Sequence, residues 1–212
     1  MAVIRERQLT SHFPPIVHAA RLDQPYGYEA LLRGVNPDGS FIFPAARFDT
    51  ARGAGMLFQL DLAVAAIDKA GIARGQVVFK IVDTERTHDS EHLRSILDYY
   101  RGVGFLIALD DVGAGYSSLN LIHLLRPVII ELDMGRVRHV DRDSHKARIA
   151  ANLLDIANAL GIDAFTEGIE TEGELRWVQQ HGAKYVQGFL IARPTPTPVT
   201  AVASRSPVQV AD

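Results

Sequence analysis

The sequence predicts an α/β fold of the TIM-barrel type, in which the strands of a parallel sheet alternate with helices. One observation is that short strand-like segments and segments of helical periodicity follow each other along most of the chain. Another is that acidic residues recur at the ends of strand-like segments, such as Asp110 and Asp111 after the apolar run GFLIAL. Because (β/α) barrels build their functional face at the carboxyl ends of the strands, these acids are expected to converge on one site.

The first elements predict an N-terminal antiparallel hairpin. Residues 14–20 (PPIVHAA) and 26–33 (YGYEALLR) have strand-like composition, and the polar segment RLDQP between them is typical of a turn. Residues 44–70 then predict a helix, which carries apolar residues at helical spacing and stops at Gly71. The β-branched segment QVVFKIV (76–82) predicts a further short strand.

The remainder of the chain alternates between strands and helices. The predicted strands are 104–111, 128–133, 163–168 and 184–190. The predicted helices are 89–102, 116–126, 144–160 and 171–182. Together with the hairpin this makes seven strands, one fewer than a complete barrel, in a chain of 212 residues where about 250 are typical. We expect one domain over 1–194, followed by a disordered, proline-rich tail over 195–212.

Composition argues against several classes of protein. A formal net charge of −3 argues against an electrostatic interaction with a nucleic-acid polymer. The absence of cysteine excludes disulfides and fits a reducing compartment. No apolar run approaches the roughly 20 residues of a membrane-spanning helix, and the N-terminus lacks the apolar region of a signal peptide. We therefore expect a cytoplasmic protein without a membrane segment.

Four segments of the chain carry a family resemblance. The segment EALLR contains Glu29 and Arg33, and the others are DDVGAGYSSL, FTEGIET and VQGFL. They are similar, in the same order, to EALLR, DDFGTGYSSL, AEGVET and QGYL of the EAL-domain family, bacterial phosphodiesterases that linearise cyclic di-GMP with two metal ions. The resemblance runs from about residue 14 to Pro194 and implies a TIM-barrel-like fold.

The resemblance implies a role for each matching residue. It makes Glu29, Asp110, Asp111 and Glu167 metal ligands, Arg33 a phosphate contact, Gln187 a residue that positions water, and Glu170 an anchor for the loop after the aspartate pair. The residues by themselves leave alternatives open. Asp111 could cap the helix that follows it, and a lone arginine such as Arg33 after a strand is commonly an ordinary surface residue.

Three departures from the family pattern argue against catalysis. Where the family has a metal-binding glutamate before the aspartate pair, this chain has Lys80. Where the family reads LKID, with a lysine that holds the attacking water, this chain reads IELD and has Glu131. The third departure is a missing βα unit between Ala70 and QVVFKIV, which in the family carries a metal-binding asparagine. An ammonium group has only donors and cannot ligate a cation.

Lys80 and Glu131 lie on the two strands that flank the Asp110 strand, so their side chains are expected to share a layer of the barrel and to pair. The alternative is that one of them points to solvent. The missing unit should leave a gap between the Glu29 strand and the Lys80 strand, to be covered by residues 41–58 or by a second subunit. We expect closure within one chain, and homodimer contacts through the helices after Asp111 and Asp133.

The leading functional prediction is a degenerate EAL-like domain in cyclic di-GMP signalling. It would lack phosphodiesterase turnover, require no cofactor and act in regulation by binding a protein partner. A second hypothesis is a cyclic di-GMP receptor that holds the nucleotide through Arg33 without metals. A third is a surviving cyclic-guanylate-specific phosphodiesterase, in which Glu29, Asp110, Asp111 and Glu167 hold Mg or Mn.

Overall fold

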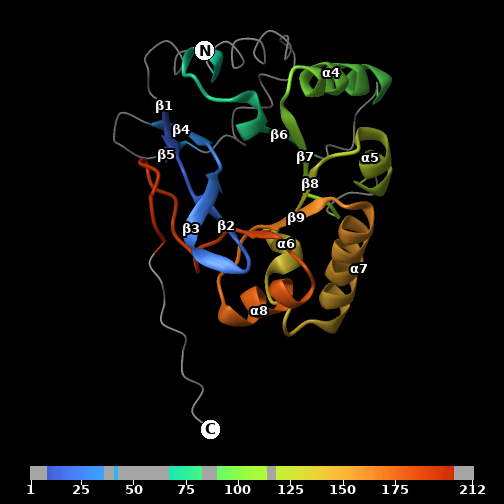
Figure 1. Cartoon of the computed structure of the whole chain (residues 1–212). Coiled ribbons are helices and arrows are strands. Elements are labelled where there is room, and N and C mark those ends of the chain that lie inside the picture. Colours follow the sequence, from blue (N-terminus) through green and yellow to red (C-terminus); the bar gives the residue numbers. More distant parts are fainter. Residues whose placement is uncertain (1–8, 36–40, 43–66, 83–89, 114–117, 203–212) are drawn as a thin grey trace.

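The computed structural model of the chain describes residues 9–35, 41–42, 67–82, 90–113 and 118–202 (Figure 1). Within these residues, seven strands form a curled sheet in the order β3-β2-β10-β9-β8-β7-β6. The strands are β2 (Pro15–His18), β3 (Arg21–Tyr28), β6 (Val78–Val82), β7 (Leu106–Asp110), β8 (Ile129–Leu132), β9 (Asp163–Thr166) and β10 (Tyr185–Val186). The five strands from β6 to β10 pair in parallel, as the alternating sequence predicts.

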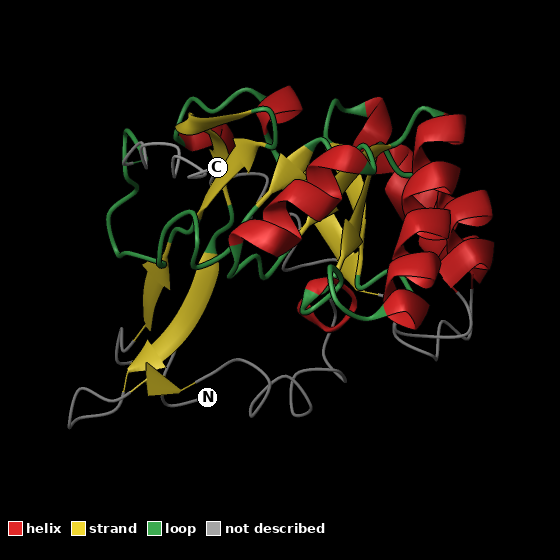
Figure 2. Cartoon of the chain, turned by 90° about the horizontal axis from the view of Figure 1, so that it is seen from below, coloured by secondary structure: helices red, strands yellow, loops and turns green. Residues whose placement is uncertain are grey.

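Helices connect the parallel strands and lie outside the curl (Figures 1 and 2). They are α4 (Ser90–Gly102), α5 (Ser118–Leu125), α6 (Met134–Val137), α7 (Ser144–Leu160) and α8 (Glu172–Gln180). Local sequence explains the ends of α7, because the Asp143 side chain accepts hydrogen bonds from the amides of His145 and Lys146, and Gly161 ends the helix with φ 67°. The prediction of a TIM-barrel-like α/β fold is confirmed. None of the described helices is long and apolar enough to cross a membrane.

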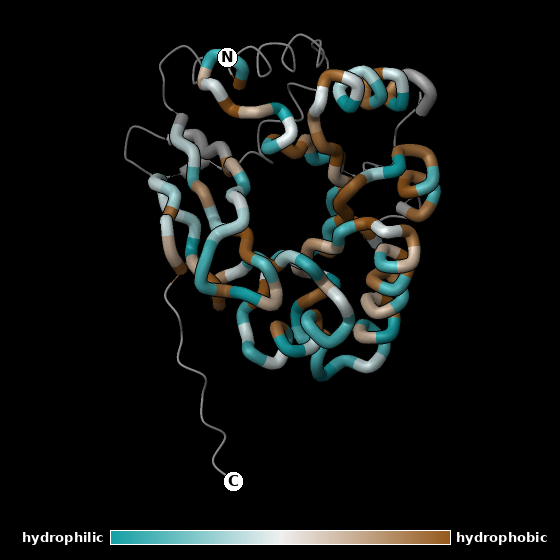
Figure 3. The backbone as a smooth tube through the Cα atoms, in the orientation of Figure 1, coloured by the Kyte–Doolittle hydropathy of each residue, from teal (hydrophilic) through white to brown (hydrophobic). Residues whose placement is uncertain are grey.

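The core lies between the parallel strands and these helices. Leu109, Ile130 and Leu132 on the strands and Leu154 on α7 are at most 1% exposed. Figure 3 shows hydrophobic residues along β7 and β8, whereas the outer loops near α8 are hydrophilic. Burying one such side chain contributes about 1.5–3 kcal/mol, so this layer holds the strands whose ends carry the acids.

The N-terminal hairpin is confirmed, but its turn and its second strand differ from the prediction. β2 and β3 pair in antiparallel fashion, and RLDQP lies inside β3, while the turn is at Ala19 and Ala20. β3 ends the sheet, and an edge strand tolerates polar side chains and a proline such as Pro25. The predicted strand 26–33 is divided, because its second part belongs to β4 (Leu31–Val35). β4 pairs with β1 (Leu9–His12) and β5 (Phe41–Ile42) in a separate three-stranded sheet.

The seven-stranded sheet has two ends, β3 and β6, and no described strand joins them. This agrees with the predicted gap between the Glu29 and Lys80 strands. β5 falls between residues 34 and 76 but pairs with β4 rather than with either end. Most of the predicted helix 44–70 and most of the segment 41–58, expected to cover the gap, lie outside the described residues.

Part of the segment expected to be a disordered tail packs against the N-terminal strands. The amide of Phe13 donates to the carbonyl of Thr195 at 2.8 Å. The amide of Val202 donates to the carbonyl of Asp23 at 3.1 Å. Val202 is 8% exposed and belongs to the core. Residues 195–202, the first part of the expected tail, thus make defined contacts, and one of these, from Val202, is with the edge strand β3. Residues 203–212 lie outside the described part.

Candidate functional site

The parallel strands bring most of the predicted site residues to one end of the sheet. Asp110 ends β7, Glu131 lies in β8, and Glu167 and Gln187 directly follow β9 and β10. Lys80 lies in β6, with Ala108 opposite it in β7, and Glu29 directly follows β3. Parallel strands end at the same edge of a sheet, so residues distant in the sequence become neighbours here.

The Lys80 ammonium group lies among three carboxyl groups from three different elements. Its Nζ donates to Glu29 Oε1 at 2.7 Å and lies 3.2 Å from Asp110 Oδ2 and 2.9 Å from Glu131 Oε2. The Lys80 side chain is 26% exposed, whereas that of Glu131 is 1% exposed. The expected contact between Lys80 and Glu131 is thus confirmed, as part of a larger carboxyl cluster.

Burial and charge set the protonation of this cluster. Burial alone would lower the pKa of Lys80, but Glu131, Glu29 and Asp110 outweigh it and raise that pKa above its ordinary value. Burial raises the pKa of Glu131 to about 10, and a hydrogen bond with the Glu167 side chain acts in the same direction, against the opposing effect of Lys80. By distance alone Lys80 and Glu131 would form an ion pair. We treat Glu131 as a neutral acid at neutral pH, because almost none of its side chain reaches water.

Gln187 connects the last strand to the same cluster. Its Nε2 donates to Glu29 Oε2 at 3.1 Å, and the residue is 5% exposed. Glu29 therefore accepts hydrogen bonds from Lys80 on one oxygen and from Gln187 on the other. The amide of Gln187 thus donates to a carboxyl group, and the water-positioning role that the family resemblance implies stays a prediction.

Asp111, the second residue of the aspartate pair, has an unusual backbone conformation. Its φ is 56°, and its amide donates to its neighbour Asp110 Oδ1 at 2.9 Å. Burial and the negative charges of Asp110, Asp133 and Glu167 raise the pKa of Asp111. Asp133, which the sequence reasoning did not select, caps α6 by accepting from the amide of Gly135 at 2.9 Å. Residues 114–117, which would show whether Asp111 caps α5, lie outside the described residues.

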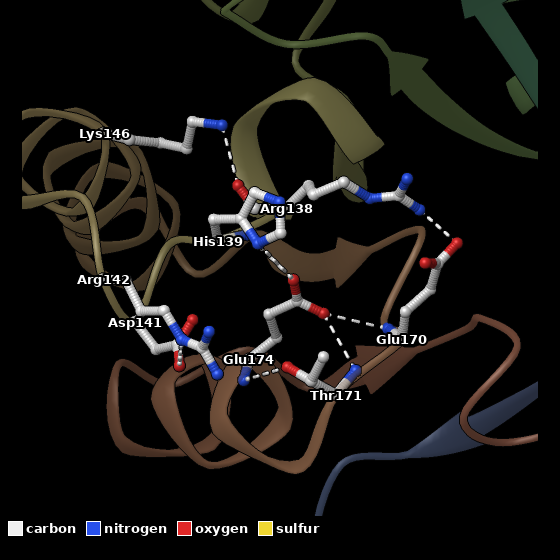
Figure 4. Close-up of polar contacts among 8 residues, drawn as sticks. All are labelled: Arg138, His139, Asp141, Arg142, Lys146, Glu170, Thr171 and Glu174. Carbon is white, nitrogen blue, oxygen red and sulfur yellow. Dashed lines mark hydrogen bonds and ion pairs between the residues drawn. The ribbon is translucent and has the colours of Figure 1, made fainter.

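A second polar network lies beside the site and centres on Glu174, a residue that the sequence reasoning also missed (Figure 4). The Glu174 carboxylate is 1% exposed and accepts from the amides of His139, Glu170 and Thr171 at 2.8, 2.9 and 3.0 Å. The signal in the sequence is the capping box Thr171-Glu172-Gly173-Glu174. Glu170 pairs with Arg138, whereas much of the loop it was expected to anchor lies in residues 114–117.

The structure places Arg33 only by its backbone, which lies in β4 opposite Thr10. No group of three or more histidine, aspartate or glutamate side chains in the described part of the chain is arranged to hold a metal ion. A physical reason is visible around Lys80, because its ammonium group already lies among Glu29, Asp110 and Glu131. The residues present therefore do not fit the metal pair that the family resemblance implies.

Comparison with known proteins gives consistent matches. The profile of the EAL domain matches residues 61–194, more than half of the chain. The bifunctional diguanylate cyclase/cyclic di-GMP phosphodiesterase MucR of Pseudomonas aeruginosa is 24% identical over 233 residues, covering 91% of this chain and 34% of that protein. The probable cyclic di-GMP phosphodiesterase PdeG of Escherichia coli is 34% identical over 118 residues, covering 56% of this chain and 23% of that protein. The chain thus spans about a third or less of the length of these curated relatives.

Solved structures agree on the fold. The structure of the MucR phosphodiesterase in complex with c-di-GMP superposes with a TM-score of 0.81 at 24% identity, covering 92% of this chain and 94% of that one. A manganese/cyclic di-GMP complex of BlrP1 from Klebsiella pneumoniae superposes with a TM-score of 0.74 at 26% identity, covering 88% of this chain and 56% of that one.

Proposed function

The chain belongs to the EAL-domain family, and from this premise we propose that it is a degenerate EAL domain of bacterial cyclic di-GMP signalling. In this proposal it has no phosphodiesterase turnover and acts in the cytoplasm as a regulatory module that binds another protein. The observation that carries the proposal is the Lys80 ammonium group, which lies within 2.7–3.2 Å of Glu29, Asp110 and Glu131. Of these, Glu29 and Asp110 stand where the family resemblance implies metal ligands.

The two exchanged residues remove two parts of the family chemistry. The ammonium group of Lys80 has only N–H donors. It therefore cannot bind a water molecule as a metal ion does, nor lower the pKa of that water as a metal ion would. Glu131 stands where the family has a lysine, and at neutral pH it is a buried, neutral acid whose pKa is about 10. It therefore provides no positive charge to stabilise the negative charge that develops at phosphorus. Losing either part typically costs about 10²–10³-fold in rate.

A cyclic di-GMP receptor is the second candidate. It is favoured by the BlrP1 complex and by the c-di-GMP complex of a standalone EAL protein from Vibrio cholerae, both 26% identical to this chain. The charge of the site argues against this role. Cyclic di-GMP is a dianion, and it would meet the acids Glu29, Asp110, Asp111 and Glu167. Among the described site residues, Lys80 is the cation that would offset this repulsion. In neither role does the domain require a metal, and Mg or Mn becomes necessary only if hydrolysis survives.

Two measurements on the intact chain separate these roles. Incubation with cyclic di-GMP in the presence of Mg²⁺ or Mn²⁺ is expected to yield no linear dinucleotide above background. Turnover near 1 per second or faster, within the usual range of enzymes, would contradict the proposal. Calorimetric titration with cyclic di-GMP, with and without either metal, is expected to give no heat of binding. Metal-independent binding would instead establish the receptor role.

The proposed protein contacts include a second copy of the chain. We propose that homodimerisation uses α5, the helix after Asp111, and α7, the long helix that follows Asp133 and the short α6. Leu119 on α5 is 55% exposed, and Ile149 and Leu160 on α7 are 48% and 60% exposed, which supports this choice. Light scattering on the purified chain tests it, because Leu119→Glu together with Ile149→Glu should convert a dimer into a monomer.

A further inference from the structure

A side-chain hydrogen bond joins the two ends of the seven-stranded sheet. Lys80 belongs to β6 at one end, and Glu29 directly follows β3 at the other. Figure 1 shows these strands as the two ends of the curl. The bond from Lys80 Nζ to Glu29 Oε1 at 2.7 Å therefore crosses the place where a complete barrel would have another strand.

The same ammonium group also lies close to acids on the neighbouring strands. An ammonium group has three N–H donors, and Lys80 faces three carboxyl groups, those of Glu29, Asp110 and Glu131. Glu131 is 1% exposed, and neither of its oxygens accepts a hydrogen bond of full geometry from a described residue. Because Glu131 keeps its proton, the acids whose charge Lys80 balances are Glu29 and Asp110, at 2.7 and 3.2 Å from its Nζ.

We propose that Lys80 is a built-in cation that takes over the structural work of a bound metal ion in this chain. Its ammonium group compensates the carboxyl groups of Glu29 and Asp110, at the ends of β3 and β7, and ties the two ends of the sheet together. The fold consequently has no need of a divalent cation. A further consequence is that a cation site lies latent under Lys80 and opens when the ammonium group is removed. This inference goes beyond the proposed function, because it concerns stability and metal binding, whether or not the chain hydrolyses a nucleotide.

Substitution of Lys80 by methionine tests the inference, because it keeps the length of the side chain and removes the charge. In the wild-type chain the Tm should be the same in EDTA, Mg²⁺ and Mn²⁺. In Lys80→Met the Tm should fall in EDTA and rise again with Mn²⁺. At a Mn²⁺ concentration about 100 times Kd, the rise should be about 5–10 °C. Calorimetry should show about one Mn²⁺ bound to Lys80→Met and none to the wild type.

Lys184→Met is the matched control. Lys184 pairs with Asp163 at 2.7 Å, but these side chains are 44% and 34% exposed, against 26% and 15% for Lys80 and Glu29. This variant should neither lose much stability nor respond to Mn²⁺. If Lys80→Met does not fold in EDTA, expression and purification in Mn²⁺ should recover it. A failure of that recovery, a Lys80→Met protein that ignores Mn²⁺, or a wild-type chain that EDTA destabilises would each overturn the inference. None of these outcomes depends on whether cyclic di-GMP is bound or cleaved.

Discussion

At the scale of single residues, an exchange of charge accounts for the character of the site. Lys80 is a base where the family has an acid, and Glu131 is an acid where the family has a base. The structure shows that the two exchanged residues differ in charge, because Lys80 is ionised and Glu131 is neutral. Lys80 keeps its charge with two further acids, Glu29 and Asp110, whereas Glu131 retains a proton because it is buried beside Glu167.

This inequality predicts a specific pH dependence of stability. Between pH 4.5, the ordinary pKa of a glutamate, and about 10, Glu131 is protonated in the folded chain and ionised in the unfolded chain. The unfolded state then binds fewer protons, so the free energy of unfolding falls as the pH rises through this range. Glu131→Gln removes the titrating group and should flatten that decline in denaturant titrations from pH 5 to 9. Glu172→Gln, at an exposed position of α8, should leave the slope unchanged, and an unaltered slope in Glu131→Gln would contradict the assignment.

At the scale of elements, the loops beside the site are held by a buried carboxylate. Glu174 in α8 receives the amide of His139 on one oxygen and those of Glu170 and Thr171 on the other. Burial alone would raise the pKa of Glu174, but these donors outweigh it and lower that pKa. The loop after α6 and the loop after β9, which begins with Glu167, are thereby fixed to the first turn of α8.

Replacing this carboxylate by an amide should loosen at least one of the two loops. Glu174→Gln presents one oxygen and one NH₂ group, so at least one backbone amide then faces another donor. Leaving a buried donor unsatisfied costs about 1–3 kcal/mol, which chemical denaturation can measure. Arg138→Gln breaks only the pair with Glu170, whose side chains are 34% and 39% exposed, and should cost about 0–1 kcal/mol. Equal losses in the two variants would argue against this role of Glu174.

At the scale of the whole molecule, both ends of the sheet make contacts other than strand pairing. Lys80 joins β6 to the end of β3, and the segment 195–202 lies along β3 through the amide of Val202. An uncovered edge strand exposes unpaired backbone groups, so such contacts also protect the sheet from pairing with another chain.

Two truncations measure the contribution of the C-terminal segment. A chain ending at Val202 keeps the hydrogen bonds of Thr195 and Val202 and the burial of the Val202 side chain, and its Tm should equal that of the full chain. A chain ending at Pro194 loses all three, and burial of a valine side chain alone contributes about 1.5–3 kcal/mol. Its Tm should fall by about 3 °C or more. Identical Tm values for the two truncated chains would show that the domain ends at Pro194.

The sequence alone was sufficient for the alternation of strands and helices and for the positions of the acids at strand ends. Hydrophobic periodicity is local, and motifs such as EALLR and DDVGAGYSSL keep their place relative to the strands that precede them. The sequence was insufficient at RLDQP. Its polar composition predicted a turn, but the segment forms a strand, because a strand at the edge of the sheet tolerates polar side chains. It also did not separate Glu174 from other exposed-looking acids, since its burial depends on packing between two loops.

Only the tertiary structure decided the state of the central cluster. Lys80 and Glu29 are 51 residues apart in sequence, and no local pattern links the two strands that end the sheet. Whether Glu131 carries a charge depends on how completely the surrounding layers exclude water from it, which is a property of the packed barrel. The residue types were therefore readable from the sequence, whereas their partners and protonation required the fold that brings them together, because electrostatic interactions act through space and not along the chain.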